Sequence, residues 1–588
     1  MTRTTKRSPL SLLPFLAFLF VLIFNLLLLS HFHNRSWLPE DEGQYAHVAE
    51  RILDGEILNA QIQEHHPGYI NFINALALRL FGRDLVSLRY PLVVLATLQS
   101  LLLFFVFLSR GLWTALLAAL TSTCLGFILF PNPTPNWYCL FFGILIACCL
   151  LEFRRGFPFR LEIIGFFVGV VFLLRQLSGL FIGMGVLAFL LVEESRPTVP
   201  QKKLFLARLL LVSLFGAILL YPIQAAGLLA FLLFGLWPLL LLGWAWFRVG
   251  RSNEEVLKIL VRLALGAFLA FLPLFAYHLV HHSLLSWFGD TVLRPLKTPI
   301  LWRAKIYPTF FQYSFYFIGG GYDLIVHENI SSVLNGFYWL ALPLLASVNG
   351  LFLLSHLRSL GSDKPLEAAI PFLAVFYSLV SPFNPNVLYL WLTVGFSLSG
   401  ILWLVAKSPK PRLIFWSAAT LFLCFTSVFY QAGQILAGGR LKDFIAGKKT
   451  VLVPSTLKRL GLWMSPTQLR TYTRLIQRIQ KETHAGESIF VLPINPELYF
   501  LAERRNPFRF WDILYGLQSK KEVEDAIREL AQRPPKLVIY RSSVYRSQRL
   551  FRPLILHIRK NYHLIEKIGD FQVYRSALPA PFRSRARH

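Results

Sequence analysis

The chain has 588 residues, of which 55% are hydrophobic and only 15% are charged, and its mean hydropathy is +0.53. Apolar runs recur between residues 10 and 431, each about as long as the roughly 20 residues that cross a bilayer. This composition excludes a soluble globular protein. The net charge is +28, and many of the basic residues lie in short connections between apolar runs, which indicates membrane topology rather than nucleic-acid binding.

In chain order, the apolar runs predict about thirteen membrane-spanning helices, of which the first is a retained helix rather than a cleaved signal peptide. They lie near 10–31, 86–108, 111–130, 136–151, 161–174, 178–193, 204–223, 226–247, 257–280, 335–357, 366–381, 387–406 and 412–431. With a cytoplasmic N-terminus, Lys and Arg fall in the inside connections, and the short outside connections contain neither. We therefore expect a multi-pass protein of the cytoplasmic (inner) membrane, with its C-terminal domain outside the cytoplasm.

The apolar stretch 165–192 decides the parity of this topology, because only Arg175 and Gln176 interrupt it. One continuous helix would bury Arg175 near the middle of the membrane, at a cost of several kcal/mol. Two short helices would instead bring Arg175 to a turn at the outer face and preserve the charge alternation. The sequence therefore predicts a hairpin at Arg175.

The fold class that follows is a polytopic α-helical membrane protein with a C-terminal extracytoplasmic α/β domain. We expect a transmembrane domain over 1–435, with the active site in its first outer loop at 32–85, and the α/β domain over 436–588. In this tail, helical periodicity and short β-prone runs predict two helices and four strands. The helices lie at 466–482 and 518–533, and the strands at 488–492, 537–540, 563–568 and 571–575.

The first outer loop contains the densest polar cluster of the N-terminal half. It comprises Pro39-Glu40-Asp41-Glu42-Gly43-Gln44-Tyr45 and, after an amphipathic helical stretch, His65-His66-Pro67-Gly68-Tyr69. Asp41 followed three residues later by Gln44 fits a capping box, which would make Asp41 a helix cap. The same geometry would also fix a carboxylate at the membrane interface, so a cap and a catalytic group are not exclusive.

These residues resemble a known family. The pattern Pro39-x-Asp41-Glu42-Gly43-x-Tyr45, then His66-Pro67-Gly68-Tyr69 and Leu88-Arg89-Tyr90-Pro91, is similar to membrane glycosyltransferases of the GT-C fold. It is most similar to the bacterial relatives of protein O-mannosyltransferases and lipid A aminoarabinose transferases, which depend on a phospholipid carrier. The Arg175 hairpin resembles a recurring turn of that family, and the motif-level match covers residues 37–195.

The resemblance implies a polyprenyl-phosphate-linked sugar donor, inversion at the anomeric carbon, and transfer to a lipid, glycan or protein acceptor. Asp41 matches the general base of the family, and Arg175 is placed to meet the donor phosphate. The other expected substrate-binding residues are Glu42, Tyr45, His65, His66, Tyr69 and Gln176. The expected partners are this donor and membrane lipids, with no nucleic acid.

A divalent metal is left undecided by the sequence. Many relatives have a second acidic residue in the outer turn that corresponds to residues 131–136, and this chain has no carboxylate there. His65 and His66 could replace such ligands, although adjacent histidines before a proline are more often hydrogen-bonding surface residues.

Two alternative functions stay open at this point. A polysaccharide polymerase or ligase that uses a lipid-linked oligosaccharide would share the donor chemistry. A secondary transporter would require inverted repeats and ionisable groups in the middle of its spans. The position of the acidic cluster in a loop favours an interfacial enzyme.

Overall fold

The computed structural model describes residues 12–153, 157–193, 200–301, 318–320, 322, 325–326, 330–360, 366–383, 387–437, 452–541 and 549–577. The chain forms two compact units, and neither is a continuous stretch of sequence. Unit 1 comprises Met1–His33, Pro91–Pro273 and Trp302–Thr450, and unit 2 comprises Asn34–Tyr90, Leu274–Leu301 and Val451–His588.

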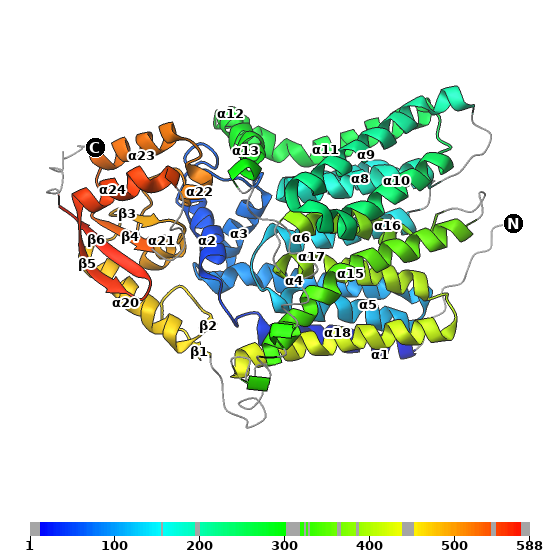
Figure 1. Ribbon diagram of the computed structural model, residues 1–588, viewed down its shortest axis with the longest axis horizontal. Helices are drawn as coiled ribbons and strands as arrows, with labels where there is room; N and C mark the ends of the chain where they lie inside the picture. The colour runs from blue at the N-terminus through cyan, green and yellow to red at the C-terminus, as the bar shows by residue number, and fades with distance from the viewer. Residues whose placement is uncertain are drawn as a thin grey trace. The chain divides into compact units, whose positions relative to one another are not determined.

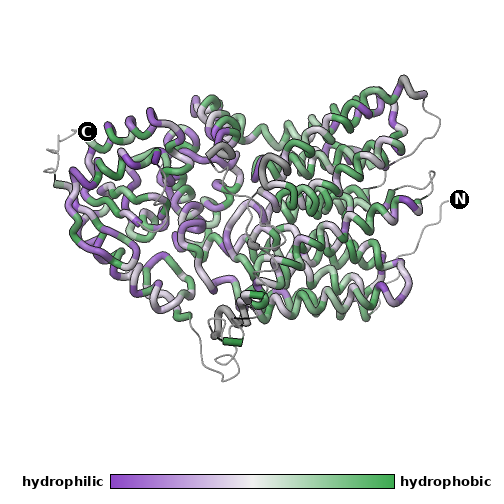
Figure 2. Tube along the Cα trace, viewed as in Figure 1, coloured by the Kyte–Doolittle hydropathy of each residue, from purple (hydrophilic) through white to green (hydrophobic). Residues whose placement is uncertain are grey.

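Unit 1 is built from α-helices, most of which are hydrophobic along much of their length (Figure 2). They are α1 (Leu12–Phe32), α4 (Tyr90–Phe107), α5 (Leu112–Cys124), α6 (Pro135–Glu152), α7 (Arg160–Leu174), α8 (Gln176–Val192), α9 (Phe205–Ala230), α10 (Leu236–Arg248), α11 (Asn253–Val280), α15 (Ile330–Ser359), α16 (Ala369–Tyr377), α17 (Val387–Val405) and α18 (Lys410–Ala437). Among the described residues, eight helices are long and apolar enough to cross a membrane. The chain is an integral membrane protein.

Each predicted span falls on a helical segment of this unit. Helix α9 is interrupted at Gly227 (φ 81°, ψ −177°), and the segment from there to Arg248 matches the span predicted at 226–247. The spans predicted at 161–174, 178–193, 204–223, 366–381 and 387–406 correspond to the shorter apolar helical segments. The count of thirteen crossings and the orientation in the membrane therefore stay predictions.

The helical hairpin at Arg175 is confirmed. Helix α7 ends at Leu174 and α8 begins at Gln176, with Arg175 between them in an extended conformation (φ −156°, ψ 118°). The two helices approach so closely at the turn that a Cβ atom added to Gly179 would lie 2.3 Å from the Cα atom of Phe172. A small residue at position 179 therefore permits the sharp reversal.

A buried polar contact fixes the first helix against its neighbours. The amide of Asn25, in α1, donates to the Ser100 hydroxyl of α4 at 3.0 Å, and its carbonyl oxygen accepts from the Thr123 hydroxyl of α5. All three side chains are buried. Because an amide is costly to bury in an apolar environment without partners, these bonds favour one packing arrangement of α1.

Unit 2 joins three segments: the first loop (Asn34–Tyr90), a middle loop (Leu274–Leu301) and the tail (Val451–His588). The loops form α2 (Pro39–Leu53), α3 (Tyr69–Phe81), the 3₁₀ turn η1 (Leu85–Arg89), α12 (Leu284–Phe288) and α13 (Arg294–Leu301). Backbone hydrogen bonds tie the first loop to the tail, as when Trp463 N donates to Asn34 O at 2.8 Å and Leu85 N donates to Arg459 O at 2.9 Å. The apolar helix α3 was not predicted from the sequence.

The tail is an α/β domain, as predicted (Figure 1). Its helices are α20 (Pro466–Glu482), α21 (Glu497–Ala502), α22 (Ile513–Gly516), α23 (Lys520–Gln532) and α24 (Arg552–Asn561). Its strands are β1 (Val453–Pro454), β2 (Trp463–Met464), β3 (Ile489–Leu492), β4 (Leu537–Arg541), β5 (Tyr562–Ile568) and β6 (Phe571–Ser576). The main sheet has the order β3-β4-β6-β5, with β3 parallel to β4 and the other two pairs antiparallel.

Local sequence signals explain where the two long tail helices begin. The Ser465 side chain accepts from the Gln468 amide before α20, and Ser519 accepts from the Glu522 amide before α23. Serine is favoured at this position because it satisfies a backbone donor that the helix leaves unbonded. Each helix then buries an apolar stripe, which includes Leu475 and Ile479 in α20.

The predicted fold class, a polytopic helical membrane protein with a C-terminal α/β domain, is confirmed. The predicted domain division between residues 435 and 436 falls at the end of α18, next to undescribed residues, and stays a prediction. The structure adds that residues 34–90 and 274–301 share a compact unit with the tail.

Candidate active site

The acidic motif of the first loop forms the first turn of α2. The helix begins at Pro39, which suits its first position because proline lacks the N–H that would stay unbonded there. Leu38 is the residue before the helix and makes no side-chain cap. The predicted capping box with Asp41 as the cap is therefore wrong, because the helix begins two residues before Asp41. Asp41 instead lies inside the first turn, where the helix dipole favours negative charge.

Asp41 is solvent-accessible, in contrast to the eight residues that follow it. Surrounding protein limits its hydration and, with the charges of Glu40 and then Glu42, raises the pKa of its carboxyl to about 6. At neutral pH it is largely ionised, yet more basic than an ordinary aspartate. These are the properties of a carboxylate that can accept a proton near neutral pH.

The two carboxylates beside Asp41 are each held by an arginine. Glu42 is fully buried and pairs with Arg89, whose Nη2 and Nε atoms lie 2.6 and 2.9 Å from the two carboxylate oxygens. Glu42 also accepts from the backbone N–H of Leu38 at 3.1 Å. Glu40 pairs with Arg541 of β4. The outer two acidic groups are therefore fixed to the first loop and to the tail.

Arg89 is completely buried and connects two motifs that are far apart in the sequence. Besides Glu42, it donates to the carbonyl oxygens of Arg35 at 3.1 Å and of Ser36 at 2.9 Å. The predicted substrate contact of Glu42 stays untested, but these partners make Glu42 a residue that positions the helix. The sequence contained the signal, since Leu88-Arg89-Tyr90-Pro91 was part of the recognised pattern, but spacing alone did not identify the partner.

The histidine motif is organised by Glu64, a residue that the sequence analysis missed. Its Oε1 atom accepts from the backbone N–H groups of His65 and His66 at 2.9 and 3.0 Å, and lies 2.8 Å from His66 Nδ1. Burial alone would raise the pKa of Glu64, but the two histidines and the backbone donor outweigh it and lower the pKa to about 2. Glu64 is therefore an ionised carboxylate that orients His66 and leaves Nε2 for another partner.

Tyr45 brings the two motifs together. It lies one turn after Asp41, so both side chains project from the same face of α2. Its ring centroid is 6.0 Å from that of His66. The other histidine, His65, stacks on Tyr515 of the tail, with centroids 4.8 Å apart and planes 10° from parallel. Asp41, Tyr45 and His66 thus form one neighbourhood in unit 2.

Gly68 permits the turn between the histidines and α3. Its φ of 141° is a conformation that side chains rarely adopt, and an added Cβ atom would lie 3.1 Å from Leu274. The middle loop supports the same turn, because Trp287 Nε1 donates to Pro67 O at 2.7 Å. Tyr69, the last predicted residue of this motif, is half-buried at the start of α3.

A second buried carboxylate of unit 2 connects all three of its segments. Asp290, in the middle loop, is 2.6 Å from Arg509 of the tail and accepts from the amide of Asn59 at 3.2 Å. This network was not predicted, because single acidic residues in loops have no spacing signal.

Arg175 and Gln176 lie in unit 1. The Arg175 side chain is buried, donates to the amide oxygen of Asn136, and lies over the ring of Tyr389, 5.6 Å from its centroid. Tyr377 donates to the backbone oxygen of Asn136 at 3.3 Å. Asn136 belongs to the predicted outer turn at 131–136, which contains no carboxylate. This turn therefore supplies an amide group as the partner of Arg175.

A metal site can be formed by one group in the part of the chain that the structure describes. The ligand atoms of Glu64, His65 and His66 lie within 4.8 Å of one another. Glu64 Oε2 is buried without a hydrogen-bond partner, whereas Oε1 already accepts three hydrogen bonds. The donor types suit zinc. The hydrogen bonds from His65 and His66 to Glu64 also account for the closeness of these groups without a metal.

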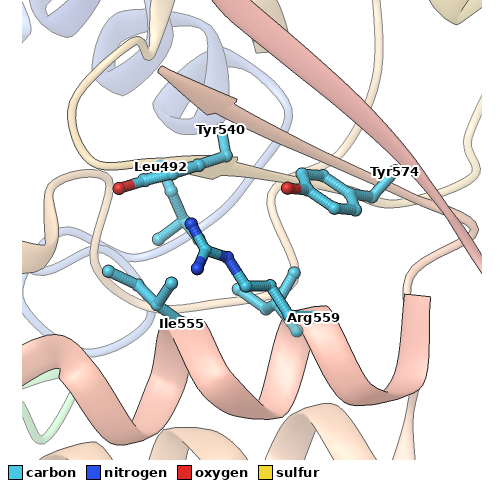
Figure 3. Close-up of a pocket in the computed structure, with 6 residues that line it drawn as sticks. Leu492, Tyr540, Ile555, Arg559 and Tyr574 are labelled. Atoms are coloured by element: carbon cyan, nitrogen blue, oxygen red, sulfur yellow. The ribbon is translucent and has the colours of Figure 1, made fainter. Parts of the chain in front are cut away.

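A small hollow in the α/β domain is separate from these residues (Figure 3). It lies between α24 and the strands β3, β4 and β6. Its lining consists of Leu492, Tyr540, Ile555, Ile558, Arg559 and Tyr574. None of the predicted site residues contributes to it.

One family model matches part of the chain. Residues 65–221 match the model of the family described as dolichyl-phosphate-mannose-protein mannosyltransferase. The match confirms the predicted resemblance over that range, which includes His65, His66, Tyr69 and the Arg175 hairpin but begins after Asp41. No curated protein matches the chain.

Two solved structures are similar to the chain over nearly its whole length. One is ArnT from Cupriavidus metallidurans bound to undecaprenyl phosphate, with 12% identity and a TM-score of 0.37. The other is ArnT from Cupriavidus metallidurans in the apo state, with 13% identity and a TM-score of 0.38. Both comparisons cover 96% of this chain and 97% of the other.

The Glu42–Arg89 pair generates a stability prediction. Glu42→Gln leaves the fully buried Arg89 guanidinium without its counter-charge, which typically costs about 3–5 kcal/mol. We expect a clear decrease in the Tm of the purified protein in detergent. The control is Asp525→Asn, which breaks the exposed pair with Arg528 and should change little. Equal Tm values for the two variants would refute a structural role for the pair.

Proposed function

We propose that the protein is a glycosyltransferase that moves a sugar from a polyprenyl-phosphate-linked donor to an acceptor hydroxyl at the outer face of the cytoplasmic membrane. The observation that supports this most is the first turn of α2, where arginines hold Glu40 and Glu42 while Asp41 between them is accessible and has a pKa near 6. The family match, whose description includes a dolichyl-phosphate sugar, supports the donor class.

In the proposed reaction, the acceptor oxygen attacks the anomeric carbon of the sugar. The Asp41 carboxylate takes the proton of the acceptor hydroxyl as the new C–O bond forms. The bond between the anomeric carbon and the phosphate oxygen breaks, and its electron pair leaves with the polyprenyl phosphate. Attack from the face opposite the phosphate inverts the anomeric configuration.

Positive charge near the departing phosphate would stabilise the transition state. Arg175 is our candidate for this contact, because its guanidinium is buried beside an amide and an aromatic ring, where electrostatic interactions are stronger than in water. Tyr45, His65, His66, Tyr69 and Gln176 are proposed to bind the sugar and the phosphate. His66 is the best oriented of them, since Glu64 fixes its ring.

Substitution of Asp41 tests whether its carboxylate is the general base. Asp41→Asn should lower transfer by about 10²–10⁴-fold, because the amide cannot accept the proton. Its Tm should stay close to that of the wild type, since only a helix-dipole contribution of about 0.3–1 kcal/mol is lost. The assay follows a defined polyprenyl-phosphate sugar and its acceptor by mass spectrometry. Near-normal transfer by this variant would eliminate Asp41 as the base, and transfer of whole oligosaccharides would favour a polymerase or ligase.

The pKa of Asp41 predicts the pH profile. The base must be ionised, so turnover should rise as pH increases through about 6 toward neutral pH. Glu40→Gln removes one charge that raises this pKa, and the acidic limb should therefore move to lower pH. Glu50→Gln is the matched control, because it also breaks an ion pair between α2 and a tail arginine, Arg459. A limb that moves equally in both variants, or in neither, would contradict the assignment.

The phosphate contact predicts an order of activities at position 175. Arg175→Lys should retain more transfer than Arg175→Ala, because a point charge replaces part of the interaction with a phosphate. Arg208→Ala serves as control, since Arg208 also lies over an aromatic ring of unit 1, that of Trp246. If Arg175→Ala is as active as Arg208→Ala, Arg175 does not meet the phosphate.

A further inference from the structure

One face of α2 contacts the tail near both ends of the helix and between them. Glu40 pairs with Arg541, and Glu50, at the other end of the helix, pairs with Arg459. Between them, the ring of His47 stacks on Tyr499 of α21, with centroids 4.7 Å apart. Positions 40, 43, 47 and 50 recur at the spacing of three and four residues that marks one helix face.

Gly43 is the closest point of this contact. A Cβ atom added to it would lie 2.4 Å from the backbone N and 2.6 Å from the Cα of Glu497, the first residue of α21. These are backbone atoms, so no side-chain rotation could relieve the overlap. Glycine in the Asp41-Glu42-Gly43 motif is therefore required by the approach of α21, and not by its own backbone conformation.

Glu497 is itself fixed in place. It is fully buried, and its Oε1 atom accepts from the Tyr472 hydroxyl at 2.9 Å and from the Asn495 amide at 2.8 Å. Tyr499, two residues later, accepts from the backbone N–H of Val491 in β3. The start of α21 is thus joined to α20 and to the central sheet of the α/β domain.

We propose that α21 is a positioning element of the active site, in which Glu497 packed against Gly43 holds the first turn of α2 and thereby sets the position of Asp41. This inference rests on the proposed function for its catalytic consequence, although the contact itself does not. Asp41 is then held from two sides. Arg89 fixes Glu42 from the first loop, while Glu497 and Arg541 fix Gly43 and Glu40 from the tail.

The protonation of Glu497 gives this contact a pH dependence. Burial first, and then the charge of Glu40, raises the pKa of Glu497 from its ordinary value of 4.5 to about 8. The other titratable groups around it are Tyr472, Tyr499 and Arg541. Glu497 is therefore neutral in the folded protein at pH 7. The stability of its packing falls as pH rises from about 4.5 and is lowest above pH 8, where the buried group is ionised.

The test combines hydrogen exchange with transfer kinetics on the full-length protein. Gly43→Ala should increase amide exchange in residues 38–48, while residues 562–577 of the sheet keep their protection. With a defined polyprenyl-phosphate sugar, its kcat should fall by about 10²-fold, since a displacement of about 1 Å can cost that much. The control is Gly216→Ala in α9, where an added Cβ atom meets nothing within 4 Å.

A second variant does not depend on the folding of Gly43→Ala. In the wild type, ionisation of Glu497 should weaken its packing against Gly43 and lower turnover above about pH 8. Glu497→Gln retains an acceptor for Tyr472 and Asn495 but cannot ionise, so this loss of turnover should move to higher pH. Exchange and kcat of Gly43→Ala equal to those of Gly216→Ala, or an alkaline limb unmoved by Glu497→Gln, would overturn the positioning role. If wild-type protein transfers no sugar but Gly43→Ala still exposes residues 38–48, the proposed function fails and the contact stands.

Discussion

The buried ion pair between Glu42 and Arg89 is the constraint on which the candidate site depends. Both side chains are removed from water, so each needs the other, and together they connect the start of α2 to the turn before α4. Arg89 also binds the carbonyl oxygens of Arg35 and Ser36, which fixes the chain that leads into the helix. The accessible carboxylate of Asp41 is adjacent to this anchored point.

Three consecutive acidic residues have three different environments in this arrangement. Glu42 is buried against Arg89, Glu40 pairs with Arg541 at the end of β4, and Asp41 between them has a raised pKa. Limited hydration, and then the negative charges of Glu40 and Glu42, raise the pKa of Asp41. All three side chains are carboxylates, but their surroundings differ. Glu40 and Glu42 therefore anchor the helix, and Asp41 is the candidate base.

The sequence was sufficient to predict the helices, the Arg175 hairpin and the α/β tail, because hydrophobic length and periodicity are local properties. It also made Asp41 a candidate base, since the acidic motif is continuous, and that role stays a prediction. It failed where the partner lies far along the chain. Glu497, for example, is more than 450 residues from Gly43. Glu64 was missed for a different reason: His66 is only two residues away, but the sequence does not show that the two side chains point toward each other. The start of α2 was misplaced because Pro39 begins the helix before the predicted cap.

The central claim is that this membrane protein recognises a polyprenyl phosphate carrier. Native mass spectrometry of the purified protein, with polyprenyl phosphate and bulk phospholipids supplied at equal concentration, tests it without knowledge of the sugar or the acceptor. The account predicts selective retention of one polyprenyl phosphate per chain. Retention no greater than that of the bulk phospholipids would contradict it.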